Sequence, residues 1–134
     1  MIVEKSDTMS VTTSEDVVRV RQRVRAQAVA LGFSLVDQTK IVTAASEIGR
    51  NTVDYGGGGT LLIELLREGA RRGLRLTFTD QGPGIANLER AMTDGYTSGN
   101  GLGLGLSGAK RLCNEFAVKS TPGSGTTVTL ARWR

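Results

Sequence analysis

Glycine is the residue that most constrains this chain, because 18 of its 134 residues are glycine, against a usual share of ~7%. The glycines gather in three places: a run over residues 56–59, a pair at Gly82 and Gly84, and an alternating series over residues 101–108. Clusters of this kind build tight turns and loops, because glycine adopts backbone conformations that other residues avoid. We therefore expect a folded domain whose regular elements are separated by glycine loops.

Composition excludes several classes of function. The chain has no histidine and one cysteine, Cys113, which excludes histidine-dependent catalytic triads, an internal disulfide framework and an ordinary zinc site. The net charge is +4, but the basic residues are dispersed and aromatic residues are few, so we expect no specific nucleic-acid binding. We find no signal peptide and no apolar run long enough to span a bilayer, so we expect a cytoplasmic protein without a membrane partner.

Two amphipathic helices are predicted in the first half of the chain. The first covers residues 16–31 and follows a capping residue at Thr13 or Ser14, both of which are favoured N-caps. The second covers residues 35–53 and follows Ser34. Apolar residues at intervals of three and four predict the two buried faces. These residues are Val17, Val20, Val24, Ala28 and Leu31 in the first helix, and Ile41, Ala44, Ala45, Ile48 and Thr52 in the second.

The rest of the chain is dominated by strand and turn signals. Residues 60–67 and 74–80 predict one antiparallel hairpin, and residues 116–120 and 126–133 predict another. We also expect short edge strands within residues 2–13, a flexible connection at 56–59, a short helix at 87–93, a glycine loop at 94–105 and a helix at 107–114. This order predicts an α+β fold: a two-layer α/β sandwich with a mixed, mostly antiparallel sheet and helices on one face.

The second predicted helix carries the first candidate cluster. Glu47 and Asn51 lie four residues apart and therefore share one helix face. An amide oxygen suits Mg²⁺, and a carboxylate can accept a proton from a hydroxyl group. The alternative is an ordinary solvated polar face, which this pair alone does not exclude.

The second candidate cluster is Asp80 with Gly82 and Gly84, at the end of a predicted strand. A carboxylate held there can accept a hydrogen bond from an exocyclic amine, and the glycines allow close approach of a flat ligand. The alternative is a turn sequence that needs no ligand.

The third candidate cluster is the alternating series Gly101, Gly103 and Gly105, which precedes a predicted helix. Backbone N–H groups in such a loop, together with the helix N-terminus, favour phosphate. It is not a Walker motif, because no Gly-Lys-Ser/Thr sequence follows it. The alternative is a mobile linker, which the interleaved leucines disfavour.

Together these clusters are far more specific than each alone. Residues 40–130 carry four motifs in a fixed order. They are Glu-x₃-Asn on a helix, Asp-x-Gly-x-Gly after a strand, an alternating glycine loop, and Gly125-Thr126 at a last strand. This series resembles the Bergerat, or GHKL, ATP-binding fold of gyrase, Hsp90, MutL and sensor histidine kinases. Residues 1–134 would then be a single GHKL domain.

The resemblance implies a role for each matching residue. Glu47 would be the general base, and Asn51 would hold the Mg²⁺ that bridges the ATP phosphates. Asp80 would receive the adenine amino group. Thr126, or the adjacent Thr127, would support Asp80. The full set implied to contact the nucleotide is Asn51, Asp80, Gly82, Gly84, Ile85, Gly101, Leu102, Gly103, Leu104, Gly105, Leu106 and Thr126. Lys110 and Arg111 would add positive charge or be ordinary surface residues.

The size of the chain implies a subfamily. A lone GHKL domain is similar to the bacterial serine/threonine kinases of partner-switching pathways. We favour the switch kinases of the RsbT type, which phosphorylate STAS-domain proteins of the stressosome and then activate a PP2C-type phosphatase, because an arginine, Arg50, precedes Asn51 as in that branch. The alternative is an anti-sigma factor, which sequesters a sigma factor and phosphorylates its STAS-domain antagonist. An inactive domain is disfavoured, because every motif residue is present.

Overall fold

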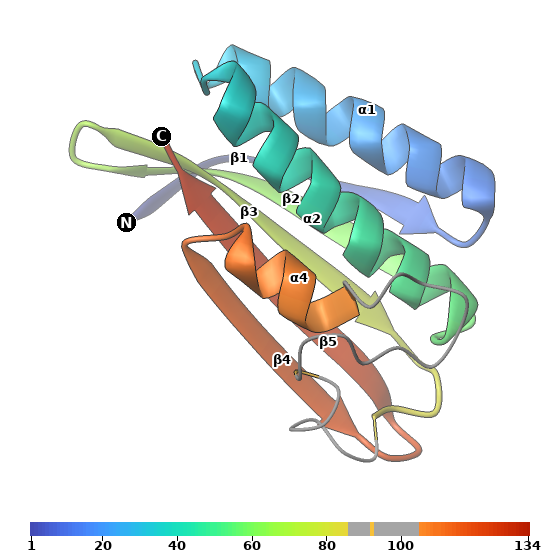
Figure 1. The fold of residues 1–134 in the computed structure, drawn as a ribbon. Helices are drawn as coiled ribbons and strands as arrows, with labels where there is room; N and C mark the ends of the chain where they lie inside the picture. The colour runs from blue at the N-terminus through green and yellow to red at the C-terminus, as the bar shows by residue number, and fades with distance from the viewer. Residues whose placement is uncertain (86–91, 93–104) are drawn as a thin grey trace.

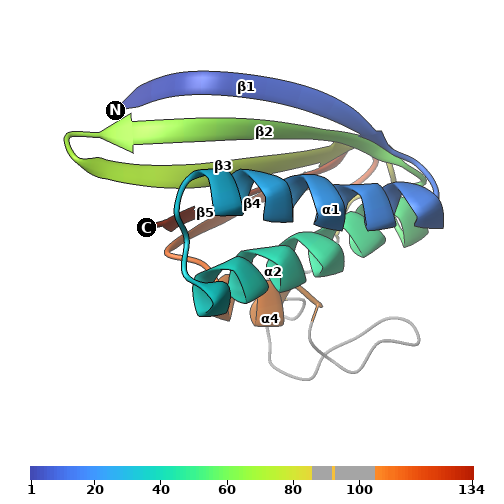
Figure 2. The same cartoon turned by 90° about the horizontal axis from the view of Figure 1, so that it is seen from above.

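The computed structural model describes residues 1–85, 92 and 105–134. Its elements are β1 (Ile2–Val11), α1 (Ser14–Ala30), α2 (Leu35–Asp54), β2 (Gly59–Glu68), β3 (Arg71–Asp80), α4 (Gly105–Arg111), β4 (Glu115–Thr121) and β5 (Gly125–Trp133). The strands form one sheet in the order β1-β2-β3-β5-β4, and the helices cover one of its faces (Figures 1 and 2). This is the predicted two-layer α+β sandwich. The sheet is antiparallel at every pairing of these strands, in agreement with the mostly antiparallel sheet that the sequence predicted.

The first strand differs from its prediction. β1 is a single strand of ten residues, where we expected one or two short strands. It pairs with β2 from Ile2 opposite Arg67 to Val11 opposite Gly59, with a register shift between Val3 and Lys5. Because β1 is an edge strand and almost all of it is exposed, its residues lack the apolar alternation that marks a half-buried strand. The predicted short helix at 87–93 lies outside the described residues, apart from Met92.

The two long helices begin at the predicted caps. The Thr13 hydroxyl accepts a hydrogen bond from the backbone N–H of Asp16, and the Asp16 carboxylate accepts one from the N–H of Thr13, which completes a capping box. The Ser34 hydroxyl accepts from the N–H of Asp37 in the same way. Asp37 does not close a second box, because its carboxylate binds Arg132 at the end of β5. The helix caps therefore agree with the sequence.

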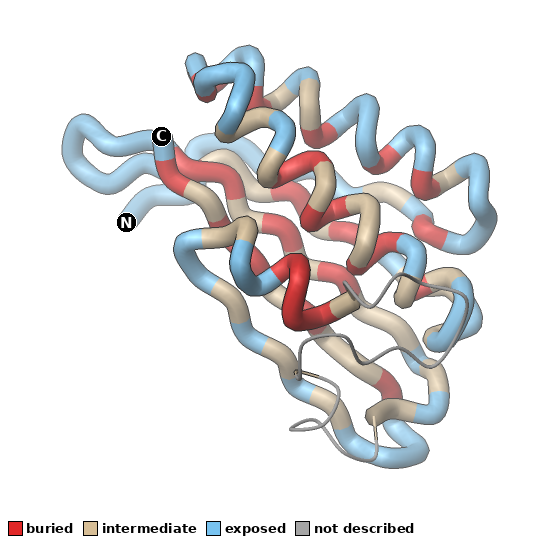
Figure 3. The backbone as a smooth tube through the Cα atoms, in the orientation of Figure 1, coloured by how far each residue is buried: buried red, intermediate tan, exposed pale blue. Residues whose placement is uncertain are grey.

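The core lies between the helices and the sheet, as the red segments of Figure 3 show. Every residue predicted for the buried faces of α1 and α2 is at most 8% exposed. These helices pack on the alternate strand residues Leu61, Ile63, Leu74, Leu76, Phe78, Val128 and Leu130. Cys113 is half-buried beside this core, and burial raises the pKa of its thiol to about 11. No helix in the described part of the chain is both long enough and apolar enough to cross a membrane.

The ion pair between Asp37 and Arg132 makes stability depend on pH. Hydrogen bonding to Arg132 holds the pKa of Asp37 below its usual value of 3.8. A carboxyl group with a lowered pKa in the folded state stabilises the fold above its unfolded pKa, and loses that contribution as the pH falls through its folded pKa. We expect the free energy of unfolding in urea to decrease below about pH 4, and Asp37→Asn to remove part of this decrease. Asp7→Asn is the control, because Asp7 pairs with Arg23 at an exposed site, where ion pairs contribute little.

Candidate functional site

Helix α2 presents the first pair of candidate residues. Gly49 marks the side of α2 that faces α1 and the core, because a Cβ atom there would lie 3.6 Å from Phe78 and 3.9 Å from Val17. Glu47 and Asn51 are each two residues from Gly49, so they lie roughly 200° around the helix from it. Both are half-buried, and neither side chain bonds to the residues that the structure describes. This side of α2 therefore offers an unengaged carboxylate and an unengaged amide.

Asp80, the last residue of β3, has a carboxylate fixed by backbone groups. Its Oδ1 atom accepts hydrogen bonds from the N–H of Gly82 at 2.9 Å and from the N–H of Thr126 at 3.2 Å. Its Oδ2 atom accepts none from the described residues. Bonds to two backbone groups orient the carboxylate, so Oδ2 is left as a positioned acceptor.

Gly56 joins the end of α2 to Asp80. Its N–H donates to the backbone oxygen of Asn51 at 3.1 Å, and a Cβ atom on it would lie 2.4 Å from Asp80 Cγ and 2.5 Å from Asp80 Oδ2. A Cβ atom on Gly82 would lie 2.7 Å from Gly56. The glycine run at 56–59 is therefore not simply the flexible connection that the sequence suggested. Its first glycine permits the close contact between α2 and Asp80.

A hydroxyl network lies behind Asp80. The Ser120 hydroxyl accepts a hydrogen bond from the N–H of Ile85 at 2.7 Å and lies 2.8 Å from the Thr126 hydroxyl. Thr126 is opposite Asp80 in the β3–β5 ladder, whereas Thr127 is opposite Thr79 and so points to the other face. Of the two threonines that the sequence left open, Thr126 is the one bonded to Asp80, and the donor is its backbone N–H and not its hydroxyl.

Sequence reasoning missed Gly56 and Ser120 as members of this site. Gly56 was hidden in a run of four identical residues, and nothing in the run distinguishes the member that touches Asp80. Ser120 was assigned only to a strand. The one signal that could have found it is register, because counting back across the turn of the last hairpin places Ser120 opposite Thr126.

The third candidate cluster is described only at its end. Gly101, Leu102, Gly103 and Leu104 lie outside the described residues. Gly105 begins α4 with a φ of +38°, and Leu106 is buried in the core at 5% exposure, so its side chain packs inward. Gly84, by contrast, cannot be replaced without strain, because its φ is +75° and a Cβ atom would lie 2.3 Å from the Thr121 backbone oxygen.

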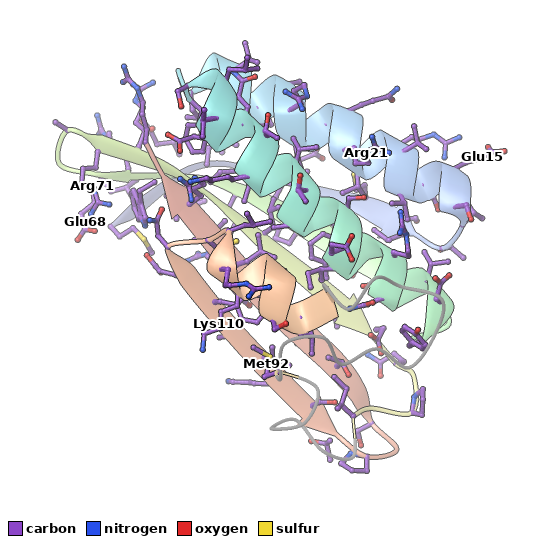
Figure 4. The ribbon with its side chains drawn as sticks, viewed as in Figure 1. Glu15, Arg21, Glu68, Arg71, Met92 and Lys110 are labelled. Atoms are coloured by element: carbon purple, nitrogen blue, oxygen red, sulfur yellow. The ribbon has the colours of Figure 1, made fainter. Side chains whose placement is uncertain are left out.

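The two basic residues at the end of α4 are exposed, and Lys110 projects from the helix (Figure 4). Arg111 makes an interaction within the protein. Neither is placed among the groups around Asp80.

The class of protein follows from the fold, the site and the comparisons taken together. The model of the histidine kinase-, DNA gyrase B-, and HSP90-like ATPase family matches residues 36–134, so the chain belongs to that family. The fold is shared with a solved structure of the RsbU and RsbW domains of Rv1364c from Mycobacterium tuberculosis, with a TM-score of 0.65 and 24% identity. The match covers 96% of this chain and 33% of that one.

Its relatives place the chain more narrowly. It is 42% identical over 123 residues to serine/threonine-protein kinase RsbT of Bacillus subtilis (strain 168), which covers 92% of each chain. It is 31% identical to the anti-sigma F factor of Pasteuria penetrans, over 86% of this chain and 81% of that one. Within the ATPase family, the chain therefore belongs with the RsbT-type serine/threonine-protein kinases.

Gly56→Ala tests whether close contact between α2 and Asp80 is needed for nucleotide binding. The added Cβ atom cannot fit 2.4 Å from Asp80 Cγ, so Asp80 or the α2 end must shift. We expect ATP affinity measured by calorimetry to fall at least about tenfold, because losing a hydrogen bond to a charged group costs ~1.5–3 kcal/mol.

The matched control is Gly49→Ala, in the same helix between the two candidate side chains. Its Cβ atom would meet only ordinary contacts, and alanine favours helix over glycine by up to ~1 kcal/mol. If both variants bound ATP as the wild type does, the contact at Gly56 would have no role in the site.

Proposed function

We propose that this chain is an ATP-dependent protein serine/threonine kinase of a cytoplasmic partner-switching pathway. Its substrates would be STAS-domain proteins, and it would then activate a PP2C-type phosphatase through that enzyme or its regulatory domain. The observation that carries the proposal is that a candidate base-binding carboxylate lies against the end of the helix with the candidate catalytic pair. Asp80, which can accept a hydrogen bond from a base, packs against Gly56. The N–H of Gly56 in turn donates to the backbone oxygen of Asn51, at the end of the helix that presents Glu47 and Asn51.

Adenine recognition would fall to Asp80. Its Oδ1 atom is occupied by two backbone N–H groups, so Oδ2 is the atom left to accept from the exocyclic amino group of adenine. Guanine carries a carbonyl oxygen at that position, which a carboxylate repels. The proposed site therefore prefers ATP to GTP. Gly82 and Gly84 would line the base. Each is held against neighbouring backbone that leaves no room for a Cβ atom, Gly82 against Gly56 and Gly84 against Thr121.

The residues present also fit a magnesium ion that is shared with the nucleotide. No group of three or more acidic, cysteine or histidine side chains among the described residues could form a protein cage for a metal. Asn51 supplies one neutral oxygen, and Mg²⁺ commonly takes one or two protein ligands together with substrate phosphates and water. When bound, the ion would neutralise negative charge on the phosphates.

Glu47 would act as the general base of transfer. Its carboxylate is unengaged among the described residues and lies one turn from Asn51, on the same face of α2. It would accept the proton of the substrate serine or threonine hydroxyl while that oxygen attacks the γ-phosphorus and ADP leaves. Because phosphoryl transfer depends mainly on positioning and electrostatics, the remaining residues of the site would act by holding ATP.

The second candidate function is that of an anti-sigma factor. It is favoured by the relatives named anti-sigma F factor, which are 29–32% identical to this chain over 84–86% of it. In that case, binding of a sigma factor would be the main output and phosphorylation of the antagonist would end it.

The test is transfer of labelled phosphate from ATP to purified STAS-domain proteins of the same organism. The proposal expects Mg²⁺-dependent labelling of a serine or threonine, identified by mass spectrometry. A chain that binds a sigma factor and labels only the STAS-domain antagonist of that factor would be an anti-sigma factor instead of a switch kinase. A preparation that binds ATP but labels no STAS-domain protein would contradict both candidate functions.

A further inference from the structure

Helices α1 and α2 lie side by side on the sheet (Figure 2). Their side chains leave a groove between them, which we call the helix groove. It is lined by Val18, Arg21, Gln22, Arg25 and Val42. Val42 is 7% exposed and forms the floor, whereas Val18 is 48% exposed at the rim. Neither Glu47 nor Asp80 lines the helix groove, so it is separate from the proposed ATP site.

The residues along the helix groove follow the spacing of a helix-packing seam. Positions at intervals of four, three and four share one face of each helix, and on both helices this face is half apolar and half polar. They are Val18, Gln22, Arg25 and Val29 on α1, and Leu35, Thr39, Val42 and Ser46 on α2. The exposed apolar members include Val29 at 55% and Leu35 at 71%. A groove between two helices with apolar residues at its floor and rim can hold the apolar face of an amphipathic helix.

The charge at the helix groove is positive and uncompensated. On the other side of α1, Arg19 pairs with Asp16, and Arg23 pairs with Asp7. Arg21 (Figure 4) has no acidic partner among the described residues, and Arg25 bonds only to the neutral side chain of Gln38, at 3.3 Å. Helix α1 therefore pairs Arg19 and Arg23 with acidic residues on one side, whereas Arg21 and Arg25 on the groove side have no acidic partner among the described residues.

We propose that the helix groove docks an acidic amphipathic helix of a protein partner. The apolar stripe of that helix would cover Val18 and Val42, and its flanking carboxylates would pair with Arg21 and Arg25. The apolar floor and rim between two helices argue for a helix with an apolar stripe, and the arginines without acidic partners argue for acidic flanks. The proposal goes beyond the proposed function, because this docking needs neither ATP nor Glu47.

The experiment measures fluorescence anisotropy of a synthetic three-heptad peptide with leucines at seam spacing and glutamates beside them. The full chain should bind it, and the double variant Arg21→Glu/Arg25→Glu should bind at least about tenfold more weakly, because like charges then face each other. The double variant Arg72→Glu/Lys119→Glu carries the same charge change at exposed positions on the sheet and should bind as the wild type does. Glu47→Ala should also bind unchanged, which separates docking from catalysis.

Several results would overturn the proposal. One is a wild-type chain that does not bind the peptide, and another is equal weakening by the two double variants. Equal binding of a peptide with the same composition but scrambled leucine spacing would also contradict a helical occupant. Stronger competition by a DNA oligonucleotide than by the acidic peptide would assign the arginines to nucleic acid instead.

Discussion

Asp80→Asn is expected to weaken ATP binding by at least about tenfold, and to have the largest effect on binding of any single change in the site. The amide oxygen of the variant would take the place of Oδ1 and accept from Gly82 and Thr126. Its NH₂ group would then face the adenine amino group, so two donors would oppose each other. Hydrogen bonds to charged groups contribute ~1.5–3 kcal/mol, and every 1.4 kcal/mol is a factor of ten in affinity.

The measurement is calorimetric titration with ATP and with GTP. Preference for ATP over GTP should shrink in the variant, because its NH₂ group can donate a hydrogen bond to the guanine carbonyl oxygen, which a carboxylate repels. Asp54→Asn is the matched control, since Asp54 is exposed at the end of α2. Unchanged ATP affinity in a folded Asp80→Asn protein would remove Asp80 from the site.

Glu47→Ala is expected to abolish phosphoryl transfer while leaving ATP affinity within about twofold of the wild type. General-base catalysis contributes roughly 10²–10⁴-fold to a rate, and in this proposal Glu47 touches the attacking hydroxyl and not the nucleotide. Single-turnover transfer to a STAS-domain protein and ATP titration of the same preparation measure the two effects separately.

Glu68→Ala is the control for this second prediction, because Glu68 is exposed at the turn between β2 and β3. It should transfer phosphate at the wild-type rate. If Glu47→Ala lost ATP binding in proportion to its loss of transfer, Glu47 would be a ligand-binding residue and not a base.

Local structure was predictable because its causes are local. Thr13 and Ser34 cap the helices where the sequence placed the caps, and Leu74, Leu76 and Phe78 alternate into the core as their spacing predicted. For β1 the edge position was predicted but its length was not, because an exposed edge strand is stabilised by pairing with β2 and needs no apolar pattern of its own.

The long-range part of the site was less predictable from the residues alone. That Asp80 meets Gly56 and Thr126 depends on how α2 and β5 pack beside β3, which are contacts across 24 and 46 positions of sequence. Spacing along the chain carries no information about such contacts. The order of the three motifs indicated them only through resemblance to a known fold, and that resemblance did not single out Ser120.

A crystal structure of the chain with Mg²⁺ and a non-hydrolysable ATP analogue tests the central claim most directly. We predict the adenine amino group within hydrogen-bond distance of Asp80 Oδ2, Mg²⁺ bound by Asn51 and the terminal phosphate on the Glu47 side of α2. A nucleotide bound elsewhere, or an adenine ring that does not contact Asp80, would contradict the account.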